Sequence, residues 1–147
     1  MNKTVIITGG TRGIGEACVR LFSEKMNVVF FYLKNDDIAR RLELETGSVG
    51  YKVDVSDRES VRLAIGQIVE RFGSIDVLVN NAGITRDKLL MQMKDNDIDD
   101  VLSINLKSAF LCSRAVTRTM LKQRSGRIIN TSSIVGIAGE AGQTNYR

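Results

Sequence analysis

The stretch Thr8-Gly9-Gly10-Thr11-Arg12-Gly13-Ile14-Gly15 follows a β-branched apolar run and opens an amphipathic segment. Gly9 is placed for a tight turn between strand and helix, which glycine adopts without steric cost. Gly13 lets the backbone approach a pyrophosphate, Gly15 lets helix and strand pack closely, and the helix N-terminus offers free N–H groups to an anion. The alternative is a purely structural turn. In the dinucleotide-binding interpretation, the loop comprises Gly9, Gly10, Thr11, Arg12, Gly13, Ile14 and Gly15.

Outward from this loop, apolar β-branched runs alternate with amphipathic stretches. The runs are nearly continuously hydrophobic, which indicates a sheet covered on both faces. The order predicts one α/β domain over residues 1–147, a doubly wound parallel sheet (Rossmann-like) with strand order 3-2-1-4-5 and right-handed crossovers. The predicted strands are Lys3–Thr8, Asn27–Leu33, Val49–Val55, Asp76–Ala82 and Arg127–Thr131, and the predicted helices are Gly13–Lys25, Asp36–Glu45, Asp57–Phe72 and Asp95–Gln123.

Composition argues against several classes of protein. The 147 residues are 43% hydrophobic and 26% charged, which is typical of a soluble domain. No apolar run approaches the roughly 18 residues of a membrane span, and the short apolar start is unlike a signal peptide, so we expect a cytoplasmic protein without a membrane partner. The net charge of +4 arises from basic residues spread among 17 acidic ones, and no nucleic-acid partner is expected.

The chain contains no histidine and only two cysteines, Cys18 and Cys112. The cysteines are isolated, without a CxxC pair, so we expect packed thiols and no metal site. Without histidine, a Ser-His-Asp mechanism is excluded. Acid–base chemistry must therefore use other side chains.

The Gly-x-x-x-Gly-x-Gly spacing resembles the signature of the short-chain dehydrogenase/reductase family. The resemblance covers essentially the whole chain, because further family motifs follow in order: Asp54 after the third strand, Asn80-Asn81-Ala82-Gly83 after the fourth, then Asn105, Ser133 and Tyr146. The segment Asn81–Lys94 is most similar to the 3-oxoacyl-[acyl-carrier-protein] reductases of this family.

The end of the second predicted strand bears on the choice of cofactor. An NAD site normally has a carboxylate there, but Phe31–Asn35 contains none. Lys34 and Arg12 suit a 2'-phosphate instead, which favours NADPH. Asp36 and Asp37, directly beyond, leave NAD open.

The resemblance implies roles for two further segments along the cofactor. Asp54 and Val55 resemble the pair that holds the adenine ring. Asn81, Ala82 and Gly83 resemble the segment along the cofactor ribose, although the same residues alone predict only a turn after a strand.

Carbonyl reduction by hydride requires a group that polarises the carbonyl and an acid that protonates the forming alkoxide. By resemblance, Ser133 binds the substrate oxygen, Tyr146 donates the proton and Asn105 holds a water in the proton relay. Taken singly, these residues are equally consistent with a turn hydroxyl, an interface aromatic and a helix-kink residue.

The family pattern also places a lysine four residues after Tyr146, at position 150, whereas the sequence ends at Arg147. Arg147 lies about 100° around a helix from Tyr146 and does not replace that lysine. We therefore expect a C-terminally truncated chain with impaired catalysis, lacking the last strands of the family's sheet. The resemblance implies a homo-oligomer, with Val101, Phe110 and Met120 of the long helix as apolar positions for a partner subunit.

The resulting hypothesis is NADPH-dependent reduction of 3-oxoacyl-[acyl-carrier-protein] in fatty-acid biosynthesis, with an acyl carrier protein thioester as substrate. Arg124 matches a basic docking position for the acidic carrier, and it is equally consistent with a solvated charge at a helix end. A non-catalytic NADP(H)-binding fragment or assembly partner remains open, as does a reductase of acetoacetyl-CoA or another small ketone.

Overall fold

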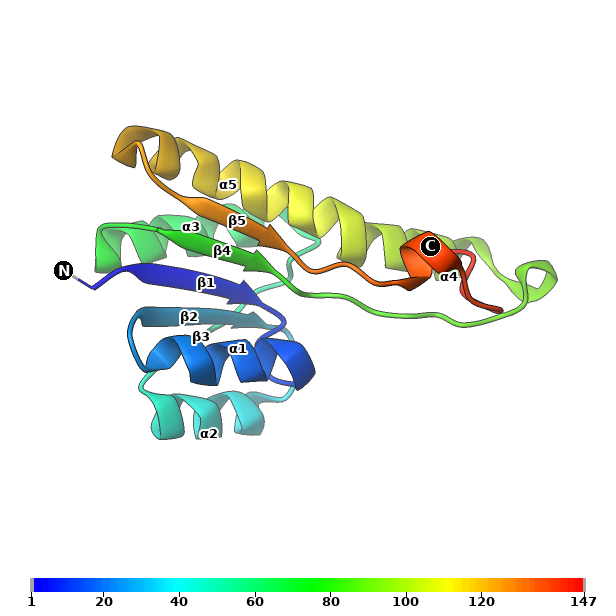
Figure 1. Cartoon of the computed structure of the whole chain (residues 1–147), viewed down its shortest axis with the longest axis horizontal. Helices are drawn as coiled ribbons and strands as arrows, with labels where there is room; N and C mark the ends of the chain where they lie inside the picture. The colour runs from blue at the N-terminus through cyan, green and yellow to red at the C-terminus, as the bar shows by residue number, and fades with distance from the viewer. Residues whose placement is uncertain (1, 147) are drawn as a thin grey trace.

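A five-stranded parallel sheet in the order β3-β2-β1-β4-β5 forms the centre of the computed structural model, which describes residues 2–146 (Figure 1). This order confirms the predicted doubly wound topology. The sequence placed several strand ends too far along the chain, because the backbone leaves the sheet there and turns into the loops of the candidate site. The strands are β1 Thr4–Thr8, β2 Asn27–Tyr32, β3 Val49–Lys52, β4 Val77–Asn80 and β5 Arg127–Asn130.

Helices cover both faces of the sheet, with α1 (Gly13–Ser23) and α2 (Asp36–Thr46) on one side and α3 (Arg58–Phe72) and α5 (Ser108–Gln123) on the other (Figure 1). Successive residues of a strand point to opposite faces, so each strand supplies two cores. The core under α3 and α5 includes Ile6, Val29, Phe31 and Leu78, and the core under α1 and α2 includes Val5, Ile7, Phe30 and Val79.

The predicted helix Asp95–Gln123 is a continuous rod with an irregular middle. It comprises α4 (Asp95–Val101), the π-helical η2 (Leu102–Lys107) and α5. Within η2, the N–H of Ser108 donates to the carbonyl of Ser103, five residues back. Such wide turns change the helical phase and are frequent at functional sites.

The burial of the rod's side chains corrects the expected partner-facing positions. Val101 is buried and Met120 packs against the core, whereas Phe110 alone of the three is exposed. Two short helices were not predicted, η1 (Leu90–Gln92) and α6 (Val135–Ala138). Among the described residues, no helix is both long and apolar enough to cross a membrane.

Candidate functional site

The predicted phosphate loop lies at the carboxyl end of β1, where it leads into α1 (Figure 1). Gly9 has a φ of +69°, and the N–H groups of Gly9 and Gly10 donate to Phe31 O at 2.9 and 3.1 Å. A Cβ on Gly15 would lie 2.1 Å from Gly9 O, so only glycine allows this approach of helix to loop. A Cβ on Gly13 would meet no atom within 4 Å. The loop is thus closely packed at Gly15 and open at Gly13.

The N-terminus of α1 is available to an anion. Arg12 occupies the N-cap position with extended backbone and makes no side-chain capping hydrogen bond. The first N–H groups of a helix carry partial positive charge. The open side at Gly13 and the uncapped helix end together fit the pyrophosphate of a dinucleotide.

Thr8 joins the phosphate loop to the segment after β4, a role that the sequence analysis did not identify. Its Oγ1 accepts from the N–H groups of Asn81 and Ala82 at 3.0 and 2.9 Å. In return, Asn81 Nδ2 donates to Thr8 O at 3.1 Å and Gly9 O at 3.3 Å. Since β1 and β4 are neighbours, this cross-link places the predicted ribose segment Asn81–Gly83 beside the phosphate loop.

The end of β2 carries the residues expected to choose between cofactors. Arg12 and Lys34 are exposed, and within residues 2–146 neither forms an ion pair. Asp36 is paired, because Lys52 Nζ donates to both of its carboxylate oxygens at 2.9 Å. This contact lowers the pKa of Asp36 and raises the pKa of Lys52. Lys52 therefore partly offsets the charge of Asp36, one of the two carboxylates that left NAD open.

The predicted adenine site lies after β3, where the backbone bends. Asp54 Oδ1 accepts from the N–H of Ser56 at 2.9 Å and from its hydroxyl at 2.6 Å. Val55 is partly buried and packs against the core under α3 and α5. Directly beyond this bend, Asp57 caps α3, because its side chain accepts from Ser60 N–H at 2.7 Å.

The three residues predicted for catalysis line one cavity, although Asn105 lies in η2 and the other two follow β5. The cavity has a volume of about 320 Å³ and extends to the ribose segment. Its lining residues include Asn105, Ser133, Tyr146, Asn81, Ala82 and Gly83. Motifs that are far apart in the sequence therefore lie together at the carboxyl edge of the sheet.

The side chains in this cavity have defined partners. Asn105 Oδ1 accepts from Ile84 N–H at 2.8 Å, and Asn105 Nδ2 donates to Ile84 O at 2.9 Å. The Ser133 hydroxyl accepts from Val135 N–H at 3.2 Å, and Tyr146 is half-buried. Both ends of the Asn105 amide are bonded to Ile84. The amide therefore has few remaining hydrogen-bonding positions for a water molecule. Arg147 lies outside the described residues.

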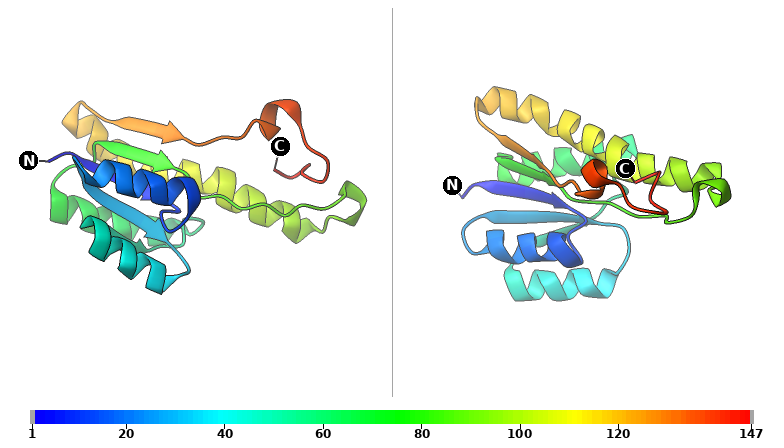
Figure 2. Two further views of the ribbon diagram at one scale, coloured as in Figure 1. Left: turned by 60° about the horizontal axis from the view of Figure 1, so that its bottom comes forward. Right: turned by 45° about the vertical axis from the view of Figure 1, so that its right-hand side comes forward.

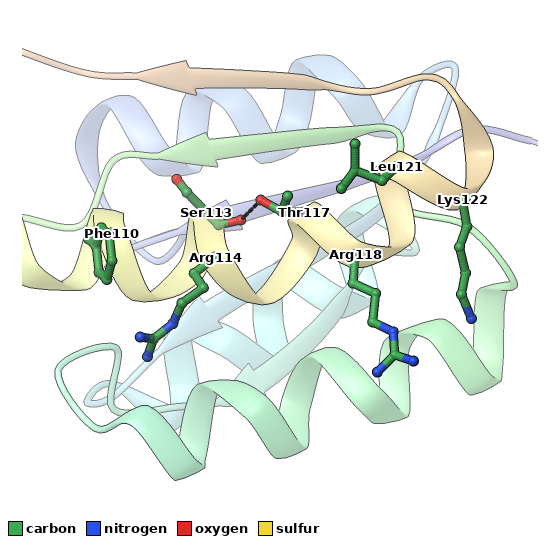
Figure 3. Close-up of a pocket in the computed structure, with 7 residues that line it drawn as sticks. All are labelled: Phe110, Ser113, Arg114, Thr117, Arg118, Leu121 and Lys122. Carbon is green, nitrogen blue, oxygen red and sulfur yellow. Dashed lines mark hydrogen bonds between the residues drawn. The ribbon is translucent and has the colours of Figure 1, made fainter.

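A second hollow, of about 650 Å³, lies along α5, and its lining side chains are drawn in Figure 3. All of its lining residues belong to α5, and none is a predicted site residue. The Arg114 guanidinium lies 5.2 Å from the centre of the Phe110 ring along this face. Despite its size, this hollow lacks the groups needed for carbonyl reduction. Its residues are Phe110, Ser113, Arg114, Thr117, Arg118, Leu121 and Lys122.

Comparison with known proteins shows the family of the chain. The short chain dehydrogenase family model matches residues 3–147. The chain belongs to that family. Its relatives include proteins named 3-oxoacyl-[acyl-carrier-protein] reductase FabG from Staphylococcus aureus, 45% identical over 99% of this chain, and from Haemophilus influenzae and Thermotoga maritima, each 44% identical over 98%. The chain spans 62%, 60% and 61% of the length of these dehydrogenase relatives, respectively.

Proposed function

We propose that the chain carries the cofactor site and most of the reducing groups of an NADPH-dependent reductase of 3-oxoacyl-[acyl-carrier-protein]. The observation that carries this proposal is the single cavity shared by Asn105, Ser133, Tyr146 and the Asn81–Gly83 segment. The names of the relatives support the thioester substrate. The product is the corresponding 3-hydroxyacyl thioester in fatty-acid biosynthesis.

Each residue has a distinct proposed role in the reaction. The Ser133 hydroxyl donates a hydrogen bond to the substrate carbonyl oxygen, and the Tyr146 phenol gives its proton to the same oxygen. Bound NADPH supplies the hydride that the carbonyl carbon accepts. A cation beside a phenol stabilises the phenolate and so speeds proton transfer at neutral pH. We therefore expect slow turnover from a polypeptide that stops before position 150.

Charge at the end of β2 supports the preference for NADPH. Arg12 and Lys34 provide two cations for a 2'-phosphate, since phosphate oxygens form charge-assisted hydrogen bonds with such groups. Lys52 holds the Asp36 carboxylate, shortly after β2, in an ion pair. NADH lacks the 2'-phosphate and gains nothing from these cations.

The proposed contact sites for protein partners lie on α5 and at its C-terminal end. Arg124 ends α5 in a left-handed conformation and is exposed, so we propose it as a contact for the acidic carrier. The outer face of α5, with exposed Phe110, is proposed as a contact between copies in a homo-oligomer.

NADPH oxidation tests this function, with acetoacetyl thioesters of acyl carrier protein and of coenzyme A as alternative substrates. We expect slow oxidation that requires the thioester, is faster with the carrier, and is lost in both Tyr146→Phe and Ser133→Ala. A preference for coenzyme A favours a small-ketone reductase. Cofactor binding without any oxidation favours the non-catalytic alternative, and oxidation that survives in Tyr146→Phe contradicts the proposed mechanism.

A further inference from the structure

The turn that precedes Tyr146 is fastened to a distant part of the chain, the loop from β4 to α4. Gly142 O accepts from Lys88 N–H at 2.9 Å, and Gln143 Nε2 donates to Asp87 Oδ2 at 3.1 Å. Tyr146 belongs to the same turn, because its own N–H donates to Gln143 O at 3.0 Å. Both stretches lie beyond the end of the sheet (Figure 2).

Asn145 makes the contacts closest to Tyr146 in sequence. Its Nδ2 donates to Asp97 O at 2.8 Å and to Arg86 O at 3.1 Å. Both partners are carbonyls, so the amide nitrogen has to face them and the orientation of the side chain is fixed. Asn145 Oδ1 is then buried without a hydrogen-bond partner among the described residues. The unpaired acceptor costs free energy and offsets part of the stability that the two donated hydrogen bonds contribute.

Asp97 is a firm anchor for this contact. Its carboxylate Oδ2 accepts from Lys88 Nζ at 2.7 Å and from Lys94 N–H at 2.9 Å, at the start of α4. Asp97 is buried, and both contacts lower the pKa of its carboxyl. The backbone carbonyl that binds Asn145 therefore belongs to a residue held from two sides.

The same loop also holds the other side of the cavity, since Ile84 binds both ends of the Asn105 amide. We propose that Asn145 is a positioning residue, which fixes Tyr146 against the cavity that contains Ser133 by hydrogen bonding to Arg86 and Asp97. The functional meaning of this contact rests on the proposed role of Tyr146. The contact itself is a separate claim and has its own test.

The test is NMR of the chain carrying ¹³C in the ζ position of tyrosine. Tyr32, Tyr51 and Tyr146 are the three tyrosines, and Tyr146→Phe identifies the third signal. In Asn145→Ala, we expect the Tyr146 signal to move toward the position of a solvated tyrosine and its response to saturating NADPH to be lost. The signals of Tyr32 and Tyr51, near the core, should not move. The matched control is Asn96→Ala, an exposed asparagine in α4, which should leave all three signals unchanged.

Hydrogen exchange gives a second readout, because the Lys88 N–H is bonded to Gly142 O. This amide should exchange at least about fivefold faster in Asn145→Ala, because that variant loses the two hydrogen bonds of the Asn145 side chain. If Asn145→Ala also shifts the signals of Tyr32 and Tyr51, Gln143→Ala serves as the milder variant and should displace the Tyr146 signal less, in the same direction.

A Tyr146 signal that stays in place in a folded variant would overturn the proposal. A wild-type chain that shows no response to NADPH contradicts the proposed function instead. The shift of Tyr146 without cofactor still tests the Asn145 contact in that case.

Discussion

Strands β1 and β5 contain the same apolar pair in very different surroundings. Ile6 and Ile7 of β1 are 0% exposed, whereas Ile128 and Ile129 of β5 are 40% and 47% exposed. β1 pairs with β2 and β4, while β5 pairs only with β4 among the described residues. Hydrophobic residues thus predict a strand, but burial depends on what covers it.

This contrast has a functional side. The phosphate loop extends directly from buried β1, and Thr8 at the end of that strand fixes the ribose segment. Ser133 and Tyr146 follow exposed β5, and the turn that carries Tyr146 is held by contacts with the loop from β4 to α4. We infer that cofactor binding has a rigid support in this chain and that the reducing groups have a weaker one.

The largest expected effect is on the free energy of unfolding, which should fall far more for a substitution beside β1 than for one on β5. Phe30 is fully buried beside β1, and Phe30→Ala should lower the free energy of unfolding by about 3–5 kcal/mol. Ile129→Ala, on β5, should cost less than about 1 kcal/mol because its side chain is already half-exposed. Urea denaturation measures both, and equal losses would contradict the comparison.

The next effect concerns the phosphate loop. In Gly15→Ala, the new Cβ would meet Gly9 O at 2.1 Å and Asn81 Nδ2 at 2.6 Å. Overpacking of this kind costs about 1–3 kcal/mol, which corresponds to roughly 5- to 150-fold weaker binding of NADPH if the loop itself is displaced. Titration calorimetry measures the affinity.

The matched control for this glycine is Gly66→Ala in the middle of α3, where an added Cβ meets no atom within 4 Å. This variant should bind NADPH normally and gain about 0.5–1 kcal/mol of stability, because alanine favours a helix interior. Unchanged NADPH affinity in Gly15→Ala would show that the loop is not the binding site.

Acid should loosen the weaker region first. The contact with Lys88 lowers the pKa of Asp97 from 3.8, so its stabilising effect is fully present above that value and is lost as pH falls through the lowered pKa. Amide exchange should therefore show residues 84–97 opening only below about pH 4, with the strands still protected. Opening near neutral pH would contradict this assignment.

The smallest effect concerns cofactor preference. Lys52→Ala should reduce the preference for NADPH over NADH only a few-fold, because exposed ion pairs interact weakly in water. The preference should fall because, without Lys52, Asp36 presents an unpaired negative charge near the proposed 2'-phosphate site. Asp36→Asn should change the preference in the opposite direction, and the ratio of the two dissociation constants measures both variants.

Local signals made much of this molecule predictable. The glycine loop and the buried strands carry their patterns within a few residues, and the structure confirms the topology they indicated. The sequence offered Asn105 as a helix-kink residue but did not predict the π-helical η2 or the contact of Asn105 with Ile84, 21 residues away. Nor did it predict the contact of Asn145, whose partner Asp97 is 48 residues distant.

The site followed a similar division. The order of the motifs predicted a shared site for Asn105, Ser133 and Tyr146, and the three residues line one cavity. Their chemical roles stay predictions. Thr8 stood inside the quoted motif, yet its bonds to Asn81 and Ala82 became apparent only once β1 and β4 were known to be neighbours.

The most direct test of the account is calorimetric titration of the 147-residue chain with NADPH and then with NADH. We predict saturable binding of one NADPH per chain, tighter than that of NADH. Absence of binding, or tighter binding of NADH, would contradict the assignment of the β1–α1 loop and the end of β2 as an NADPH site.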